Sequence, residues 1–293
     1  LRWFVGFRKL DLSGYDIVFS TSTYAAKFCK VKKGAIHICY LHSPFRFLWK
    51  RNSYSEGSLP FKGMFLWFVD RFIPLLQRID RYYTNRIDRI ITNSRNMANL
   101  IKDIYGRDAD IIHPPIDTAS YESTAVKKDY YLVVSRLLSY KRVDMAVRVC
   151  KSTNRKLVVI GDGPEMGSLK AIAGAETTFL GQVSDADLRK YYAEARGLIF
   201  PGVEDFGLVP VEAQASGCPV IAYKAGGVLE TVLDGTTGIL FDRQNVEDLS
   251  AALTKFESKE FSVADMLENV KRFDVGEFQN QINDLIDQYS NNW

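Results

Sequence analysis

Cysteine, histidine and net charge are all scarce in this sequence. Its 293 residues include four cysteines and three histidines, and the formal net charge is only +3. That charge is too small to indicate nucleic-acid binding by itself, and no RNA-binding motif, metal-spaced Cys/His set or Walker-type phosphate loop is present. The cysteines are scattered, three of them within apolar runs, which predicts buried free thiols in a reducing compartment. They are Cys29, Cys39, Cys150 and Cys218.

A secretory signal is also lacking, because Arg2, Arg8, Lys9 and Asp11 interrupt the opening apolar residues. We therefore expect a cytoplasmic protein. What the sequence does have is an ordinary apolar fraction, 46%, and a length that allows two domains with cores of their own.

The first part of the chain contains four short apolar runs that are typical of strands. They lie at 16–20, 36–41, 89–92 and 110–113. Residues 93–106 start with cap residues and end on Gly, so they are predicted to form a helix. The segment His113-Pro-Pro-Ile-Asp117 should be an extended connector, since each proline restricts the residue before it. The polar residues 117–129 then mark the expected domain boundary.

The rest of the chain alternates strands and helices, which favours a doubly wound α/β domain with a parallel sheet. Strands are predicted at 130–135, 157–160, 177–180, 198–201 and 219–223. Helices are predicted at 144–150, 165–173, 185–195, 208–216, 242–257 and 277–288. We therefore predict an N-terminal Rossmann-like domain at 1–123, a second one at 124–275 and a closing helix at 276–293 that returns toward the first domain.

The most informative segment is Glu204-Asp-Phe-Gly-Leu-Val-Pro-Val-Glu212. It places one carboxylate in the loop before a helix and another about one turn inside that helix. Between them, the free N–H groups of Gly207, Leu208 and Val209 are predicted to bind an anion, helped by the helix dipole. A carboxylate on each side of a phosphate site suits a nucleotide-sugar, with sugar hydroxyls on one side and a ribose on the other.

Two cations form a second cluster. Arg136 and Lys141 follow the predicted strand at 130–135, and ligands of open α/β sheets bind in the loops after the strands. An arginine fork and a lysine point charge together suit a diphosphate. The turn Gly161-Asp-Gly-Pro164 follows the next strand. Each motif alone is common, but their order and spacing together favour a nucleotide-sugar site.

These motifs, with Leu180-Gly-Gln-Val183-Ser between them, resemble the donor half of glycosyltransferase family 4. The resemblance extends from about Asp16 to the C-terminus and is strongest from Asp129 to Asp242. It implies the GT-B fold, in which two Rossmann-like domains face each other across a cleft, and a retaining transfer reaction. A complete member would begin with an apolar strand, a glycine-rich loop and a helix. None is seen here, so we expect the N-terminal domain to be incomplete.

The resemblance also implies roles for particular residues. Glu204 would contact the sugar, Arg136 and Lys141 the diphosphate, Glu212 the ribose, and the turn at Val183 the nucleobase. The implied donor-binding residues are Gly161, Val183, Phe206, Gly207, Leu208, Val209 and Glu212, and the implied catalytic residues are His42, Arg136, Lys141 and Glu204. For Val183 itself, a plain strand–helix turn is an equal alternative.

His42 ends a predicted strand in the string Tyr40-Leu-His-Ser-Pro-Phe-Arg-Phe-Leu-Trp49. By itself it could be a hydrogen-bonded histidine at a strand end. The resemblance implies instead that it lies beside the donor sugar, and the string is similar to that of mannosyl- and rhamnosyltransferase-like members of bacterial polysaccharide pathways. We therefore expect mannose from GDP-mannose as donor and a growing glycan or lipid-linked oligosaccharide as acceptor. No metal is expected, because the cations and the helix dipole already supply positive charge.

Three alternatives stay open. The first is a glucosyl-type transferase that uses a UDP-sugar. The second is a sugar-nucleotide 2-epimerase of the same fold, against which the spacing of Glu204 and Glu212 and the presence of Lys141 argue. The third is a donor-binding module without catalysis, which missing N-terminal elements would explain.

The aromatic segment 61–79 is broken by Asp70, Arg71 and Pro74, so it is not predicted to span a bilayer. Its helices could pack in the N-terminal core, which is the interpretation we favour from sequence, or lie on an anionic membrane near a lipid-linked acceptor. The cations that would support membrane contact are Arg46, Lys50, Arg51, Lys62, Arg71 and Arg78.

Overall fold

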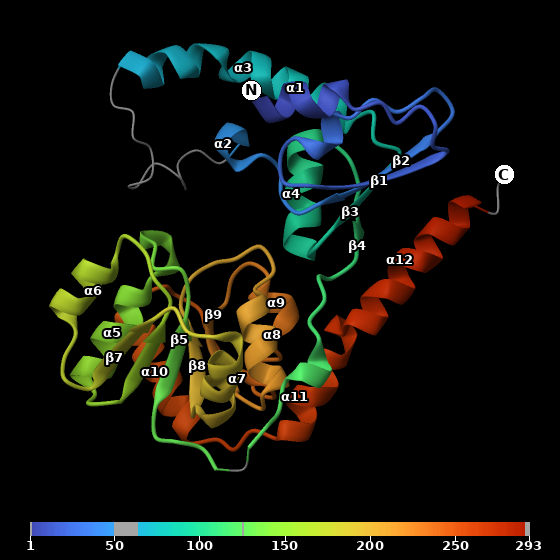
Figure 1. Ribbon diagram of the computed structural model, residues 1–293. Helices are drawn as coiled ribbons and strands as arrows, with labels where there is room; N and C mark the ends of the chain where they lie inside the picture. The colour runs from blue at the N-terminus through green and yellow to red at the C-terminus, as the bar shows by residue number, and fades with distance from the viewer. Residues whose placement is uncertain (1, 50–63, 125, 291–293) are drawn as a thin grey trace. The chain divides into compact units, whose positions relative to one another are not determined.

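The computed structural model describes residues 2–49, 64–124 and 126–290, and the chain divides into two compact units (Figure 1). The first unit comprises Leu1–His113 with Ile282–Trp293, and the second comprises Pro114–Gln281. The boundary expected at residues 123 and 124 lies inside this second unit. Helix α12 (Val275–Ser290) begins in the second unit and ends in the first.

The first unit contains a parallel four-stranded sheet in the order β1-β2-β3-β4. Its strands are β1 (Ile17–Ser22), β2 (Ile36–Leu41), β3 (Arg89–Thr92) and β4 (Asp110–Ile111). The limits predicted for β2 and β3 are confirmed. Strand β4 is two residues shorter than predicted, because His113 precedes a proline that has no N–H and restricts its conformation.

Four described helices accompany this sheet, namely α1 (Arg2–Lys9), α2 (Arg46–Trp49), α3 (Met64–Thr84) and α4 (Arg95–Tyr105). Helix α4 starts and ends as its sequence predicts. The Ser94 side chain accepts a hydrogen bond from the N–H of Met97, and Gly106 ends the helix in the left-handed conformation at φ 66°. The core beside the sheet consists of Cys39, Leu41, Ile87, Ile90, Ile101 and Tyr105.

A buried ion pair joins the helices of the first unit. Lys27 Nζ lies 2.6 Å from Asp80 Oδ1 on α3, and both side chains are almost completely buried. Asp80 Oδ2 also accepts hydrogen bonds from Trp49 Nε1 at 2.9 Å and from the Tyr105 hydroxyl at 2.5 Å. The inner face of α3 is therefore tied to α2 and α4 by polar contacts.

The second unit contains a parallel six-stranded sheet in the order β10-β9-β8-β5-β6-β7. Its strands are β5 (Tyr131–Val134), β6 (Leu157–Ile160), β7 (Thr177–Gly181), β8 (Gly197–Phe200), β9 (Val220–Tyr223) and β10 (Gly238–Phe241). The first five agree with the predicted strands to within one residue at each end. Strand β10 was not predicted.

Helices cover both faces of this sheet (Figure 1). One core contains Tyr131 and Val133 of β5 and packs against α5, α6 and α10, while the other contains Leu132 and packs against α7, α8 and α9. This alternation is what a strand buried on both faces requires. The helices are α5 (Val143–Ser152), α6 (Met166–Ile172), α7 (Asp185–Glu194), α8 (Leu208–Ala215), α9 (Val228–Thr231), α10 (Val246–Glu257) and α11 (Val263–Val270).

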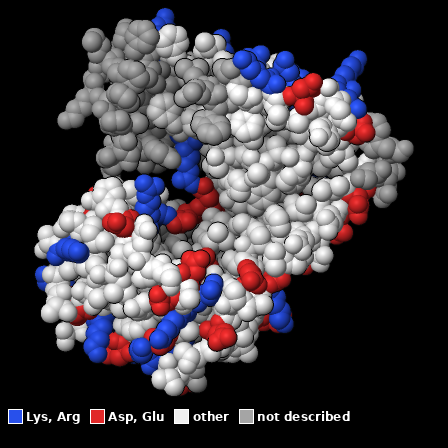
Figure 2. All heavy atoms as spheres, viewed as in Figure 1, with Lys and Arg blue, Asp and Glu red and all other residues white. Residues whose placement is uncertain are grey.

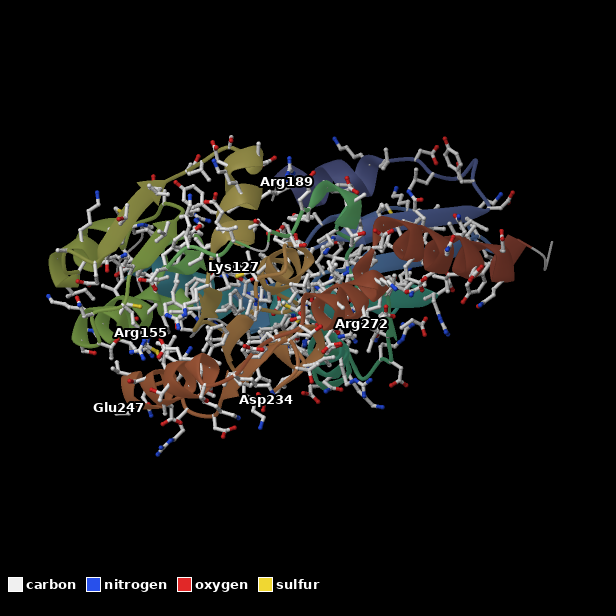
Figure 3. The ribbon with its side chains drawn as sticks, turned by 90° about the horizontal axis from the view of Figure 1, so that it is seen from below. Lys127, Arg155, Arg189, Asp234, Glu247 and Arg272 are labelled. Atoms are coloured by element: carbon white, nitrogen blue, oxygen red, sulfur yellow. The ribbon has the colours of Figure 1, made fainter. Side chains whose placement is uncertain are left out.

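Lys127 holds the carboxyl ends of two of these helices. Its Nζ donates to the carbonyl of Ala193 in α7 at 2.6 Å and to that of Gly217, just after α8, at 2.9 Å (Figure 3). A cation at a helix C-terminus interacts favourably with the helix dipole. Burial lowers the pKa of Lys127, and its two carbonyl contacts hold α7 and the end of α8 together.

Candidate active site

The strand order of the second unit predicts where a ligand binds. The chain proceeds from β5 to β6 and β7 on one side and then returns to β8 on the other. In open α/β sheets, ligands bind outside the carboxyl ends of the strands at the point where this order reverses. That point lies between β5 and β8. The loops that follow these strands, residues 135–142 and 201–207, are therefore the loops of the candidate site.

The loop after β5 is fixed by the loop after β6. The N–H of Ser135 donates to Ile160 O at 3.0 Å, and the N–H of Leu137 donates to Asp162 O at 2.9 Å. Gly161 has a φ of 125°, and a Cβ at this position would lie 1.9 Å from Ser135 O. Gly161 thus permits the close approach of the two backbones. The structure gives this residue a packing role, and its predicted contact with the donor stays a prediction.

An ion pair connects the two loops. Lys141, from the loop after β5, pairs through Nζ with Glu204 Oε1, from the loop after β8. The two side chains are 12% and 32% exposed, respectively, so the pair is partly shielded from water and fixes both groups at the reversal point. The third predicted charge, Arg136, is exposed, and its guanidinium bonds to no residue that the structure describes. It is available to an anion.

The loop that carries Glu204 rests on two glycines. The N–H of Gly227 donates to Glu204 O at 2.9 Å. A Cβ at Gly226 would lie 2.3 Å from Glu204 O, and one at Gly227 would lie 2.1 Å from Phe206 O. The side chain of Phe206 is buried against Phe273. Phe206 therefore has a packing role, and its predicted contact with the donor stays a prediction.

Helix α8 begins directly after this loop and offers N–H donors. Gly207, at φ 86°, is its N-cap, and the N–H groups of Leu208 and Val209 have no acceptor among the described residues. The third helical residue is Pro210, which has no N–H. The first turn therefore presents unsatisfied donors at the positive end of the helix, an arrangement that binds phosphate groups.

Glu212 lies farther along α8 and is held by α7. The Tyr192 hydroxyl, on a fully buried side chain, donates to Glu212 Oε2 at 2.9 Å. Burial raises the pKa of Glu212, the Tyr192 hydrogen bond lowers it, and the charges of Asp185 and Glu204 raise it. One carboxylate oxygen is thus oriented by Tyr192, while the other is bonded to no described residue.

Val183 lies in the loop between β7 and α7. Its half-buried side chain packs against the core that contains Tyr192. The next residue, Ser184, caps α7 by accepting a hydrogen bond from the N–H of Asp187. Val183 therefore has the position expected of a strand–helix turn at the carboxyl edge of the sheet. Its contact with a nucleobase stays a prediction.

His42 lies in the first unit, directly after β2, as its sequence context predicts. Its Nε2 is 2.8 Å from Thr21 Oγ1, and its ring centroid is 4.9 Å from that of Tyr40. Burial lowers the pKa of His42, which favours the neutral imidazole. Its surroundings are those of a hydrogen-bonded histidine at a strand end, and a role in the reaction stays a prediction.

Comparison with known families gives this arrangement a context. The family described as glycosyl transferases group 1 matches residues 119–273, more than half of the chain, and the one described as glycosyltransferase family 4 matches residues 3–120. This chain belongs to the glycosyl transferases group 1 family. The second match covers most of the first unit, which carries His42. Each of the two units of the glycosyltransferase chain therefore matches a glycosyltransferase family.

Curated relatives of the glycosyltransferase chain are distant and longer. The D-inositol 3-phosphate glycosyltransferases of Mycobacterium bovis and Mycobacterium tuberculosis are 28% identical to it over 206 residues. This alignment covers 61% of this chain and 43% of the relatives. The chain therefore matches less than half the length of these proteins.

Solved structures show the fold. The sucrose-phosphate synthase of Thermosynechococcus elongatus superposes with a TM-score of 0.74 at 18% identity, over 96% of this chain and 75% of that one. The Anabaena protein Alr3699/HepE, in complex with UDP-glucose, superposes with a TM-score of 0.71 at 19% identity, over 94% of this chain and 79% of that one. The fold of the glycosyltransferase chain is GT-B, with one parallel α/β sheet in each unit.

Acidic strings of the glycosyltransferase chain bear on whether it binds a metal. Two Asp-x-Asp strings occur, Asp108–Asp110 and Asp185–Asp187. Asp108 pairs with Lys102, Asp110 pairs with Arg89, and Asp187 belongs to the cap of α7. Among the residues described, no group of three or more His, Cys, Asp or Glu side chains could hold a metal ion. The expectation that no metal is needed still rests on the positive charge that the cations and the helix dipole supply.

The sequence assigns no role to the residues that support the site. Tyr192 orients Glu212 from another helix, and Gly226 and Gly227 hold the loop of Glu204. The paired glycines are visible in the sequence, but nothing local shows which loop they contact. Tyr192 belongs to a predicted helix, and its contact depends on how α7 packs beside α8.

Proposed function

We propose that this chain catalyses retaining transfer of a hexose, namely mannose from GDP-mannose, to a growing polysaccharide or a lipid-linked glycan. The observation that carries the proposal is the set of groups at the reversal point of the second sheet. There, Arg136, the Lys141–Glu204 pair and the first turn of α8 supply cationic and N–H groups beside two carboxylates. The cations and N–H groups suit a diphosphate, and the carboxylates beside them suit the hydroxyl groups of a sugar and a ribose.

The proposed reaction breaks the bond between the sugar C1 and the phosphate oxygen, and the departing diphosphate takes the bonding electrons. Arg136, Lys141 and the N–H groups of Leu208 and Val209 would stabilise that negative charge. The acceptor hydroxyl would bond to C1 on the same face of the sugar, and its proton would pass to the departing phosphate. Glu204 would orient the sugar hydroxyls during an oxocarbenium-like transition state, and Glu212 would hold the ribose.

We further propose that His42 is required for transfer, and that the reaction takes place in the cytoplasm. All four cysteines are free and buried, which fits a reducing compartment. The donor preference for mannose is supported by the string from Tyr40 to Trp49 that contains His42. Residues 50–63, which follow this string, lie outside the described part of the chain.

The test combines donor binding with turnover. Unfolding temperatures would be measured with GDP, UDP, ADP and their sugars, because a ligand at 100 times its Kd adds about 2.7 kcal/mol to the free energy of unfolding. We expect a shift with GDP and GDP-mannose. The variants Arg136→Ala and Glu204→Gln should then lower the transfer rate by roughly 10²–10³ each. Arg148→Ala, an exposed change on α5, is the control. If both site variants kept the parent rate, the assignment would be wrong.

A second candidate is a transferase that uses a UDP-sugar. It is favoured by the fold match to the Anabaena protein, whose structure is named as a complex with UDP-glucose. The same unfolding measurement separates the two candidates, since a shift with UDP and UDP-sugars alone would replace GDP-mannose by a UDP-sugar. Product analysis then distinguishes transfer from epimerisation, and nucleotide binding without turnover would indicate a donor-binding module.

A further inference from the structure

One exposed arginine of the second unit is held in a single position by hydrogen bonds. Arg272 belongs to the 3₁₀ turn Lys271–Phe273 that follows α11 (Figure 3). Its Nη2 donates to Glu230 O and, at 2.9 Å, to Asn269 Oδ1, and its Nε donates to Asn269 O at 3.2 Å. Lys and Arg atoms are scattered over the visible face of the second unit (Figure 2), so exposure alone does not distinguish Arg272. Its bonds do, because fixing a long surface side chain costs conformational entropy.

The helix that Arg272 contacts, α9, is only one turn long. Carbonyls at the end of a helix have no partner within it, and here side chains supply the donors. Arg272 donates to Glu230 O. The Asn269 amide of α11 donates to Thr231 O at 3.0 Å. Gln214 of α8 also donates to Thr231 O, at 2.8 Å, and its Oε1 accepts from the Asn269 amide at 2.7 Å. The end of α9 is therefore fixed by three neighbouring elements.

The start of α9 supports the loop that carries Glu204. Gly227 is the N-cap of α9, and its N–H donates to Glu204 O at 2.9 Å. The Gly227 carbonyl accepts from the N–H groups of Glu230 and Thr231 at 2.9 and 3.1 Å. One helical turn thus joins the carbonyls that Arg272 and its neighbours hold to the N–H that holds Glu204 O. A shift at the end of α9 would reach the backbone of Glu204.

The neighbouring Phe273 makes a second contact with the same loop. Its buried ring lies 5.4 Å from that of Phe206, between centroids, in an edge-to-face arrangement at 76°. Arg272 Cζ lies 4.5 Å from the centroid of the Phe273 ring. The turn itself is anchored by Ile116, whose N–H donates to Phe273 O at 2.8 Å and whose carbonyl accepts from Val275 N–H at 3.1 Å. Both routes start from one rigid turn and end at the loop before α8.

We propose that Arg272 is a positioning residue, which fixes the backbone of Glu204 through helix α9. The inference rests on the proposed function, in which Glu204 contacts the donor sugar. Lys141 holds the carboxylate end of Glu204, and Arg272 holds its main chain. With both ends fixed in advance, the carboxylate meets the sugar hydroxyls without a further loss of freedom on binding.

The nucleotide part of the donor depends on other contacts. In the proposed function Glu212 holds the ribose, and Tyr192 of α7 orients its carboxylate. The Gln214 side chain, which also donates to Pro210 O of the same helix at 2.9 Å, keeps its place in α8 when Arg272 is changed. Loss of the Arg272 guanidinium should therefore reduce recognition of the sugar and leave recognition of the nucleotide intact.

The test compares the affinity of the chain for a nucleotide with that for its sugar derivative. Calorimetric titrations use GDP with GDP-mannose and UDP with UDP-glucose. The Kd of the nucleotide divided by that of its sugar derivative is the sugar preference. Arg272→Met should lower the sugar preference about tenfold, which corresponds to one hydrogen bond to a charged group, and the Kd of the nucleotide should stay nearly unchanged. Phe273→Leu, which reduces the ring contact with Phe206, should lower the sugar preference as well.

A double variant shows whether Arg272 acts through Glu204. The sugar preference of Glu204→Ala/Arg272→Met should equal that of Glu204→Ala, because a residue that only positions a carboxylate has no effect once the carboxylate is gone. The matched control is Arg155→Met, which removes a guanidinium that holds Glu257 of α10 (Figure 3). It should lower the unfolding temperature and leave the sugar preference unchanged.

The inference is overturned if Arg272→Met weakens binding of the nucleotide and of its sugar derivative equally, or if it changes neither. It is also overturned if Arg155→Met lowers the sugar preference as much, or if Arg272→Met lowers it further in the Glu204→Ala background. If the unaltered chain bound no nucleotide at all, the proposed function would be contradicted and this inference would fall with it. Binding of both ligands by the unaltered chain keeps the proposed function, whatever the variants do.

Discussion

At the scale of single residues, the two carboxylates of the candidate site differ in how they are held. Glu204 is paired with a lysine, whereas Glu212 is partly buried and receives a neutral hydrogen bond from Tyr192. Burial opposes the charged form of the Glu212 carboxylate, and the Tyr192 hydrogen bond favours it. The charge of Glu212 therefore depends on Tyr192.

Replacing Tyr192 by Phe should weaken donor binding about tenfold, since a hydrogen bond to a charged group is worth about 1.5–3 kcal/mol. The turnover number should change little. The Tyr192 bond lowers the pKa of Glu212, so its loss raises that pKa, and affinity should start to fall at a higher pH as the solution is acidified. Titration of nucleotide binding against pH checks this. Tyr191→Phe, on the same helix, is the control, and an equal pH profile for the two variants would contradict the role.

Another single residue ties α10 to the sheet. Glu257 receives two hydrogen bonds from Arg155, at 2.8 and 2.6 Å, and one from the Tyr131 hydroxyl at 2.8 Å. Arg155 lies beside α10 in Figure 3. These hydrogen bonds lower the pKa of Glu257 to about 2, and the contribution of Arg155 is the largest.

A carboxylate whose pKa is lowered by folding stabilises the folded state above its unfolded pKa, and this contribution is lost as the pH falls through the folded pKa. For Glu257 the window runs from about 4.5 down to about 2. At pH 7, we expect Glu257→Gln to have a lower unfolding temperature than the parent protein. At about pH 2, where the parent carboxylate is protonated too, the two unfolding temperatures should be equal. Thermal unfolding at a series of pH values measures the difference, and a gap that did not depend on pH would exclude the ionic contribution.

At the scale of elements, the loop before α8 depends on glycines that pack against its backbone. A Cβ at Gly227 would overlap Phe206, so Gly227→Ala should displace the loop and destabilise the protein by about 1–3 kcal/mol. It should also weaken nucleotide binding.

In contrast, a Cβ at Gly167 in α6 would meet nothing within 4 Å, and Gly167→Ala should stabilise the protein by about 0.5–1 kcal/mol. Urea unfolding measures both, and equal effects of the two changes would contradict the assignment.

The same scale shows what could be predicted from the sequence. Strands β2, β3 and β6 and the caps of α4 lie where apolar runs and cap residues place them, because those signals are local. Helix α10 begins at Val246 and not at residue 242 as predicted, since Asn245 accepts a hydrogen bond from the N–H of Asp248. Helix α11 was missed, although Ser262 caps it by the same pattern.

The missed strand and the missed contacts have a different cause. Strand β10 has only four residues and begins with Gly238, so its apolar run is no stronger than that of a loop. The charged residues of the site were predicted because they are near motifs in the sequence. The supports from Tyr192, Gly226 and Gly227 come from elements that meet only after folding.

At the scale of the whole molecule, each unit has its own sheet and its own core, so each should unfold as a cooperative element. Lys27→Met leaves Asp80 buried without its partner and should cost about 3–5 kcal/mol. We expect calorimetry to show two transitions. The substitution should lower one of them, and the nucleotide should raise the other.

Lys27→Met/Asp80→Asn is the control, since the neutral amide no longer needs a cation and part of the loss should be recovered. A single transition moved by both the substitution and the nucleotide would mean that the two units unfold together. This measurement needs no knowledge of the acceptor.

The four buried cysteines can report separately on the opening of each unit. Cys29 and Cys39 belong to the first unit, and Cys150 and Cys218 belong to the second. Burial raises the pKa of Cys39 to about 11 and those of Cys150 and Cys218 to about 12, so these thiols are protected from alkylating reagents until their surroundings open. Pulsed alkylation followed by mass spectrometry would therefore time the opening of each unit in the unmodified protein, with no added dye or engineered label.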